Sequence, residues 1–208
     1  MVNTNTLVQT SGNRSREEVV LVRKFSFRPA FTLKGREFRG LRGFAGKPSH
    51  PPLTDVPVTA YLFAAAFDVI SRAGKSQPWS HDFYRAASFL LIGGAAVSLL
   101  TALTGFWDWW RSTEPGNQAR RTANAHAWTM ITVTVIVLAD LALRWFKYWG
   151  YSFTPARVAL ISVVAAGLVS LGSTIGGELV YDYGFNVEMV GAVWDRSERD
   201  VMPGEKTD

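Results

Sequence analysis

The chain lacks cysteine altogether and has only three histidines among its 208 residues. The absence of cysteine excludes disulfides, thiolate nucleophiles, CxxC redox pairs and cysteine-bound zinc or iron–sulfur centres. Any metal would therefore be bound by histidine, carboxylate or carbonyl groups. The first 20 residues contain no apolar run, which argues against a secretory signal peptide.

Charged residues are scarce in the middle of the chain. Polar ends of about 47 and 27 residues flank a segment that is much more apolar than a soluble protein. Two runs, residues 86–107 and 158–181, are long enough to cross about 30 Å of hydrocarbon. Residues 127–146 form a third run, and residues 56–70 form a shorter fourth one. The sequence thus predicts a membrane protein.

These runs predict an all-α fold, a four-transmembrane-helix bundle in up-down-up-down order, because the connections between them are short. Tryptophan and tyrosine residues near the span ends match the two membrane–water interfaces. A transmembrane domain is expected at residues 48–182, with spans at about 56–72, 85–108, 123–147 and 156–181.

The two ends of the chain differ in charge. The N-terminal arm (1–47) is basic and aromatic, and the short C-terminal tail (183–208) is acidic. The arm can orient the spans or adsorb to an anionic leaflet, and no nucleic-acid-binding motif accompanies it. Eight Lys and Arg residues lie near span ends on the side of the termini, against six opposite. This bias predicts that both termini lie in the cytoplasm.

Several polar residues are predicted to gather near one membrane surface. At 100° per residue, Asp108 extends one face of the second span, and Glu178 is expected to point inward from the fourth. Gly172 and Gly176 form a GxxxG pair that permits close helix approach. A proline-rich entry to the first span, with Pro57 in the first helical turn, is expected to be extended before the helix. The predicted polar cluster comprises His50, Asp55, Asp108, His126, Glu178 and Tyr181.

This cluster admits three interpretations. It can be a hydrogen-bonded cap over helix ends, a metal site with unknown ligands, or a haem b site with His50 and His126 as cofactor-binding residues. No HxxxH or ExxH spacing supports a metal site. No catalytic residue can be assigned because a nucleophile motif is lacking, so an enzyme is the less favoured class.

Two intramembrane acids, Asp68 and Asp140, are predicted toward the opposite surface. Ionisable residues inside spans raise a functional hypothesis by default. Internal salt bridges are the simpler expectation, since three arginines lie nearby: Arg72, Arg85 and Arg144. A proton path from this pair to the polar cluster would need polar side chains between them, and the third span offers few.

Four blocks occur in order at the span ends: GKPSHPPLTDVP (46–57), ALTGFWDWWR (102–111), ARRTANAHAW (119–128) and GGELVYDYGFNVE (176–188). Together they resemble the domain-of-unknown-function 2231 family of bacterial four-helix integral membrane proteins, over roughly residues 35–190. The resemblance implies four spans and no established activity. It gives weight to the positions that match the family motif: His50, Pro51, Asp108, His126, Gly177, Glu178 and Gly184.

Some members of that family resemble membrane anchors joined to a Rieske iron–sulfur domain. This chain has no cysteine, so any Rieske-type partner would be a separate protein. The sequence therefore favours a membrane subunit or anchor, with electron transfer through a His-ligated b-type haem as the specific hypothesis. The alternatives are an ion, proton or small-molecule carrier or channel, and a purely structural membrane interaction protein. Expected partners are the lipid bilayer and other membrane or redox-complex subunits, and no nucleic acid is expected.

Overall fold

Four helices and their connecting turns make up the described part of the computed structural model, residues 49–113 and 115–185. They are α1 (His50–Ala73), α2 (Ser80–Ser112), α3 (Gln118–Leu143) and α4 (Ala156–Tyr181), and a π-helix, η2 (Arg144–Tyr148), continues α3. No strand occurs in these residues, and the predicted all-α fold is confirmed. The predicted basic arm, and all but the first three residues of the predicted acidic tail, lie outside the described ranges.

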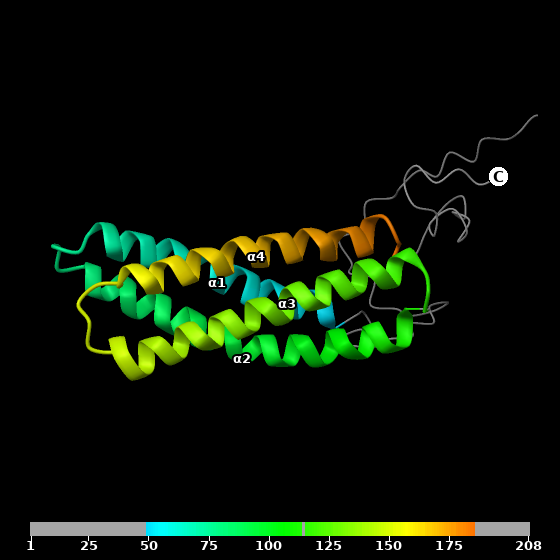
Figure 1. Ribbon diagram of the computed structural model, residues 1–208, viewed down its shortest axis with the longest axis horizontal. Coiled ribbons are helices and arrows are strands. Elements are labelled where there is room, and N and C mark those ends of the chain that lie inside the picture. The colour runs from blue at the N-terminus through cyan, green and yellow to red at the C-terminus, as the bar shows by residue number, and fades with distance from the viewer. Residues whose placement is uncertain (1–48, 114, 186–208) are drawn as a thin grey trace, which may run out of the picture. The chain divides into compact units, whose positions relative to one another are not determined.

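The helices run up, down, up and down in one bundle (Figure 1). The start of α1, the α2–α3 turn and the end of α4 lie at one end, named the histidine end after His50 and His126. The opposite end is named the arginine end after Arg144. α1 packs mainly on α2 and α4, and α3 mainly on α4. α1 and α3 are therefore diagonal, and α2 and α3 share the smallest interface between neighbours.

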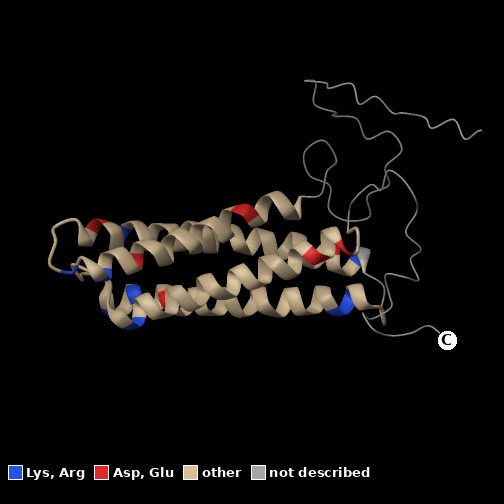
Figure 2. Cartoon of the chain, turned by 90° about the horizontal axis from the view of Figure 1, so that it is seen from above, with Lys and Arg blue, Asp and Glu red and all other residues tan. Residues whose placement is uncertain are grey.

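All four helices are long and apolar enough to cross a membrane. The candidate spans contain 24 to 32 residues, the third including η2, and at 1.5 Å per residue each exceeds the roughly 30 Å of hydrocarbon. Exposed positions carry large side chains such as Leu99, Leu103 and Phe146. Figure 2 shows the charged residues concentrated toward the two ends of the bundle. The bundle thus presents an apolar surface suited to lipid.

The start of α1 differs from the prediction. The helix begins at His50 rather than at residue 56, and the two prolines after His50 occupy its first turn, where a missing N–H costs little. The predicted extended entry is therefore wrong. Pro57 lies inside α1, not in its first turn. Because Pro57 cannot donate to the carbonyl of Leu53, that carbonyl accepts from Thr101 Oγ1 of α2 at 3.3 Å instead.

Glycine allows the helices to approach closely in the core. A Cβ atom on Gly94 of α2 would lie 2.8 Å from Cε1 of Tyr61, a fully buried residue of α1. A Cβ atom on Gly172 of α4 would lie 2.6 Å from Met130 Sδ of α3. The close approach predicted for the GxxxG pair is confirmed, and it fixes α3 against α4.

Candidate functional site

His50, the first residue of α1, packs its imidazole against α2. Its Nδ1 lies 3.0 Å from the carbonyl oxygen of Thr101 and 3.3 Å from Thr104 Oγ1. A carbonyl oxygen can only accept, so Nδ1 is the nitrogen that carries the proton. Gly105 permits this packing, because a Cβ atom there would lie 2.6 Å from His50 Cε1.

His126 of α3 is held against α4 in the same manner. Its Nδ1 donates to the carbonyl oxygen of Gly172 at 2.8 Å. A Cβ atom on Gly176 would lie 3.0 Å from His126 Cε1. Each histidine thus uses one backbone carbonyl and one glycine of the neighbouring helix.

The two imidazoles meet inside the bundle from diagonal helices. Their ring centroids are 6.4 Å apart and their planes cross at 85°. Among residues 49–113 and 115–185, no hydrogen bond reaches Nε2 of either ring. With the proton on Nδ1, each Nε2 keeps a lone pair. The structure therefore brings together the two histidines that the sequence analysis singled out as cofactor ligands.

The rest of the predicted polar cluster divides between the interior and the surface. Asp108 is buried on α2, on the face that also carries Thr101 and Thr104. Asp55, Glu178 and Tyr181 are exposed. The inward orientation predicted for Glu178 is wrong, because another face of α4 packs into the bundle. The buried residues on that face are Val158, Ser162, Ala165, Val169 and Gly172.

A second buried polar group lies at the arginine end. Arg144 Nη2 pairs with Asp68 Oδ2 and, at 3.2 Å, with Asp140 Oδ2, while Arg144 Nε donates to Asp140 Oδ1 at 3.3 Å. The three residues are at most 1% exposed. The predicted internal salt bridging is confirmed for Arg144, whereas Arg72 and Arg85 are exposed.

Three hydroxyl groups complete this arginine network. Ser162 Oγ of α4 lies 2.5 and 2.9 Å from the nearest oxygens of the two carboxyl groups. Thr154 Oγ1 donates to Asp68 Oδ1 at 2.9 Å, and Ser88 Oγ accepts from the guanidinium at 3.0 Å. A buried ion pair is tolerated when further hydrogen bonds satisfy its atoms. The network meets this condition with side chains from all four spans.

An apolar layer separates the two polar ends. Along α1, His50 and Asp68 are about 27 Å apart at 1.5 Å per residue. Between them, Leu91 and Val137 are buried and pack in one cluster with residues of all four helices. Tyr61 lies in this layer, and its Oη is the one buried side-chain polar atom of the described residues that has no hydrogen-bond partner. No continuous polar path joins the ends through these residues.

The sequence did not point to every residue of the two polar sites. Ser162 had a usable signal, because it shares a face of α4 with Ala165 and Gly172, and small residues mark helix-facing surfaces in membranes. The carbonyl groups of Thr101 and Gly172, which accept from the histidines, gave no such signal, because every residue carries a carbonyl.

Four apolar helices with polar side chains turned inward define an integral membrane protein of the multi-pass α-helical class. Comparison with protein families then identifies the family of this membrane protein. The family described as predicted membrane protein, domain of unknown function 2231, matches residues 46–189. The chain belongs to this family. No match is found among the curated proteins or the solved structures.

Proposed function

We propose that this protein is a membrane subunit or anchor that takes part in electron transfer through a b-type haem held by His50 and His126. One observation carries the proposal. Two imidazoles from diagonal helices lie 6.4 Å apart inside the bundle, and both donate from Nδ1 to a backbone carbonyl. Both Nε2 lone pairs remain for a ligand.

The donor set fits haem better than a bare metal ion. Within the described residues, no three His, Asp or Glu side chains come together as a metal-ligand set. Zinc sites take three or four protein ligands, whereas a haem would need only one or two ligands from the chain. His50 and His126 are the two imidazoles that would supply them, and their ring centroids lie 6.4 Å apart.

His50 and His126 would hold the haem, which would supply one-electron redox chemistry. The carbonyl oxygens of Thr101 and Gly172 orient the rings, and a hydrogen bond from Nδ1 raises the basicity of Nε2 as a ligand. The glycines opposite each ring leave the imidazoles room to pack between helices. These residues of the chain pre-organise two ligand nitrogens inside an apolar bundle.

The test is the haem content of protein expressed with ample haem supply and purified in detergent. We expect about one haem per chain, with a Soret band that is lost in His126→Ala. His81→Ala is the matched control, since His81 lies at the arginine end with Nδ1 3.1 Å from the carbonyl oxygen of Tyr151. A haem-free wild-type protein would overturn the proposal in favour of a purely structural membrane interaction protein. Metal analysis of the same sample would detect a bare metal ion.

The proposal also covers the membrane in which the protein lies, its orientation there and its partners. We place it in the bacterial inner membrane, as the family resemblance implies, with both termini in the cytoplasm on the bias of Lys and Arg near the span ends. Other redox-complex subunits, among them a separate Rieske-type protein, are its proposed partners. Reporter fusions at the C-terminus test the orientation, and activity of a periplasmic reporter there would contradict it.

A carrier or channel is a second candidate function, favoured by the burial of Asp68 and Asp140 within the spans. Against it, both carboxyl groups pair with Arg144, and an apolar layer separates them from the histidine end. Asp68→Asn and Asp140→Asn in proteoliposomes test this function. Ion or proton flux that is unchanged in both variants would count against it.

A further inference from the structure

The arginine network buries two carboxyl groups against one guanidinium. Asp68, Asp140 and Arg144 are the buried charged side chains at this end of the bundle among the residues that the structure describes. If both carboxyl groups were ionised, the network would carry one uncompensated negative charge inside the spans. A buried carboxylate without a partner is costly to desolvate, and two carboxyl groups that share one site rarely ionise together.

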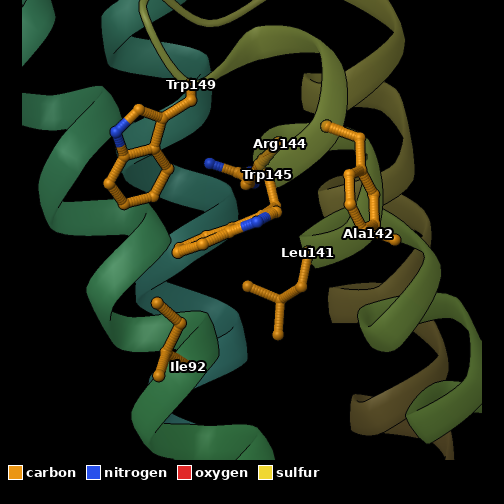
Figure 3. A pocket seen from close by; sticks show the side chains of 7 residues that line it. Ile92, Leu141, Ala142, Arg144, Trp145 and Trp149 are labelled. Carbon is orange, nitrogen blue, oxygen red and sulfur yellow. The ribbon is translucent and has the colours of Figure 1, made fainter.

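No second cation pairs with either carboxyl group among residues 49–113 and 115–185. From α2, the ring of Tyr84 lies 5.2 Å from the guanidinium carbon of Arg144, and its hydroxyl donates to the carbonyl oxygen of Tyr148. From α4, the neutral hydroxyl of Ser162 faces the two acids. The groove beside Arg144, between α2 and the third span, is otherwise lined by uncharged side chains (Figure 3). The other basic residues at this end are exposed, namely Arg72, Lys75, Arg85, Lys147 and Arg157.

The hydroxyl of Ser162 bridges the two carboxyl groups. Its Oγ lies 2.5 Å from Asp68 Oδ2 and 2.9 Å from Asp140 Oδ2, and both distances are those of hydrogen bonds. A hydroxyl has one hydrogen, and an ionised carboxyl group can only accept. One of the two contacts therefore contains no hydrogen unless a carboxyl group supplies it. A single protonated carboxyl group satisfies both contacts.

The contacts of the two acids differ in a way that distinguishes their charge. Asp68 makes the closer pair with Arg144 Nη2, and its Oδ1 accepts from Thr154 Oγ1 at 2.9 Å. Asp140 lies 3.2 and 3.3 Å from the guanidinium nitrogens, and its Oδ1 can accept from Nε without being ionised. Asp68 is therefore the better placed anion, and Asp140 Oδ2 is the better placed donor to Ser162.

We propose that the arginine network is a binding site for one proton. The proton lies on Oδ2 of Asp140, which donates to Ser162 Oγ, and the hydroxyl of Ser162 donates in turn to Asp68 Oδ2. Asp68 and Arg144 then form the one ion pair of a neutral network. Loss of the proton leaves a negative charge between α1, α3 and α4, so the packing of these helices is coupled to proton binding. The proposal does not depend on haem binding at the histidine end.

Infrared spectroscopy of the full-length protein in detergent at neutral pH tests this site. A protonated carboxyl group has a carbonyl stretching band that carboxylates lack and that shifts in D₂O. Asp140→Asn keeps a neutral donor and acceptor in place and should remove the band of one carboxyl group per chain. Asp68→Asn should remove the same band, because Asp140 then ionises to pair with Arg144. Asp82→Asn, an exposed acid at the same end, is the matched control and should keep the band.

Two infrared results would overturn the proposal. A wild-type protein without a protonated carboxyl band has no bound proton, and this measurement needs no variant. A band that persists in full in Asp140→Asn comes from another acid.

The pH dependence of stability gives an independent measurement. Carboxyl groups exposed to water are ionised at neutral pH, so unfolding releases the proton bound to Asp140. Stability should therefore fall as the pH rises, by up to about tenfold in the folding equilibrium constant per pH unit for one proton. This fall should be smaller in Asp140→Asn than in Asp82→Asn, since the first variant has no carboxyl group to bind the proton. An equal pH dependence of the two variants would also overturn the proposal.

Discussion

The two ends of the bundle bury polar groups in different ways. At the arginine end, two carboxyl groups and a guanidinium are held by hydroxyl groups from neighbouring spans, and side chains satisfy most of their hydrogen bonds. At the histidine end, backbone carbonyls orient two imidazoles, and each ring retains a lone pair on Nε2. The comparison indicates that the first arrangement holds the helices together, and we propose that the second binds a ligand.

The largest expected effect comes from removing the cation of the arginine network. Arg144→Met leaves Asp68 and Asp140 buried without their partner, and breaking a buried ion pair costs about 3–5 kcal/mol. Unfolding in detergent, followed by circular dichroism, measures this loss of stability. Combining Arg144→Met with Asp68→Asn and Asp140→Asn removes the uncompensated charge and should recover much of the loss. An Arg144→Met variant as stable as the wild type would show that the arginine network does not hold the helices together.

A smaller effect is expected where His50 packs against α2. Gly105→Ala forces the ring away, since the new Cβ would lie 2.6 Å from Cε1, and such overpacking costs about 1–3 kcal/mol. The displaced ring should also bind haem more weakly. Gly93→Ala on the same helix meets open space and should be neutral or stabilising by about 0.5–1 kcal/mol. Equal stability and haem binding in these two variants would show that Gly105 does not position the ring.

The smallest effect is expected for the exposed part of the predicted cluster. Glu178→Gln and Tyr181→Phe alter surface side chains and should change the free energy of unfolding by no more than about 0.5 kcal/mol. Thermal unfolding and haem content of both variants provide the measurement. A loss comparable to that of Gly105→Ala would contradict the assignment of Glu178 to the surface of the bundle.

The spans themselves were predictable because length and hydropathy determine which segments cross a membrane. The predicted span at 156–181 agrees with the bounds of α4. α1 and α2 extend beyond their predicted spans at both ends, and α3 begins five residues earlier than predicted and is continued by η2 to Tyr148. The start of α1 was misplaced because its prolines were interpreted as preventing a helix. Only the tertiary contact from Thr101 to the carbonyl of Leu53 shows how Pro57 is accommodated.

The rotation of the helices was harder to predict than their existence. Lipid is as apolar as the core, so hydropathy does not tell the inner face of a span from the outer one. Polar residues within the spans correctly predicted the buried faces of α2 and α3, since Thr104 and Asp140 are both buried. The same reasoning failed for α4, because Glu178 lies near a helix end where an acid can face water. The small residues of α4 were the better guide to its inner face.

The spin state of ferric haem in the purified protein tests most directly whether His50 and His126 bind one ligand together. Two imidazoles give a low-spin iron, so electron paramagnetic resonance should show a low-spin signal in the wild type and in His81→Ala. Replacing either paired histidine by alanine should give a high-spin signal or a haem-free protein. A wild-type low-spin spectrum in His50→Ala or in His126→Ala would contradict the account.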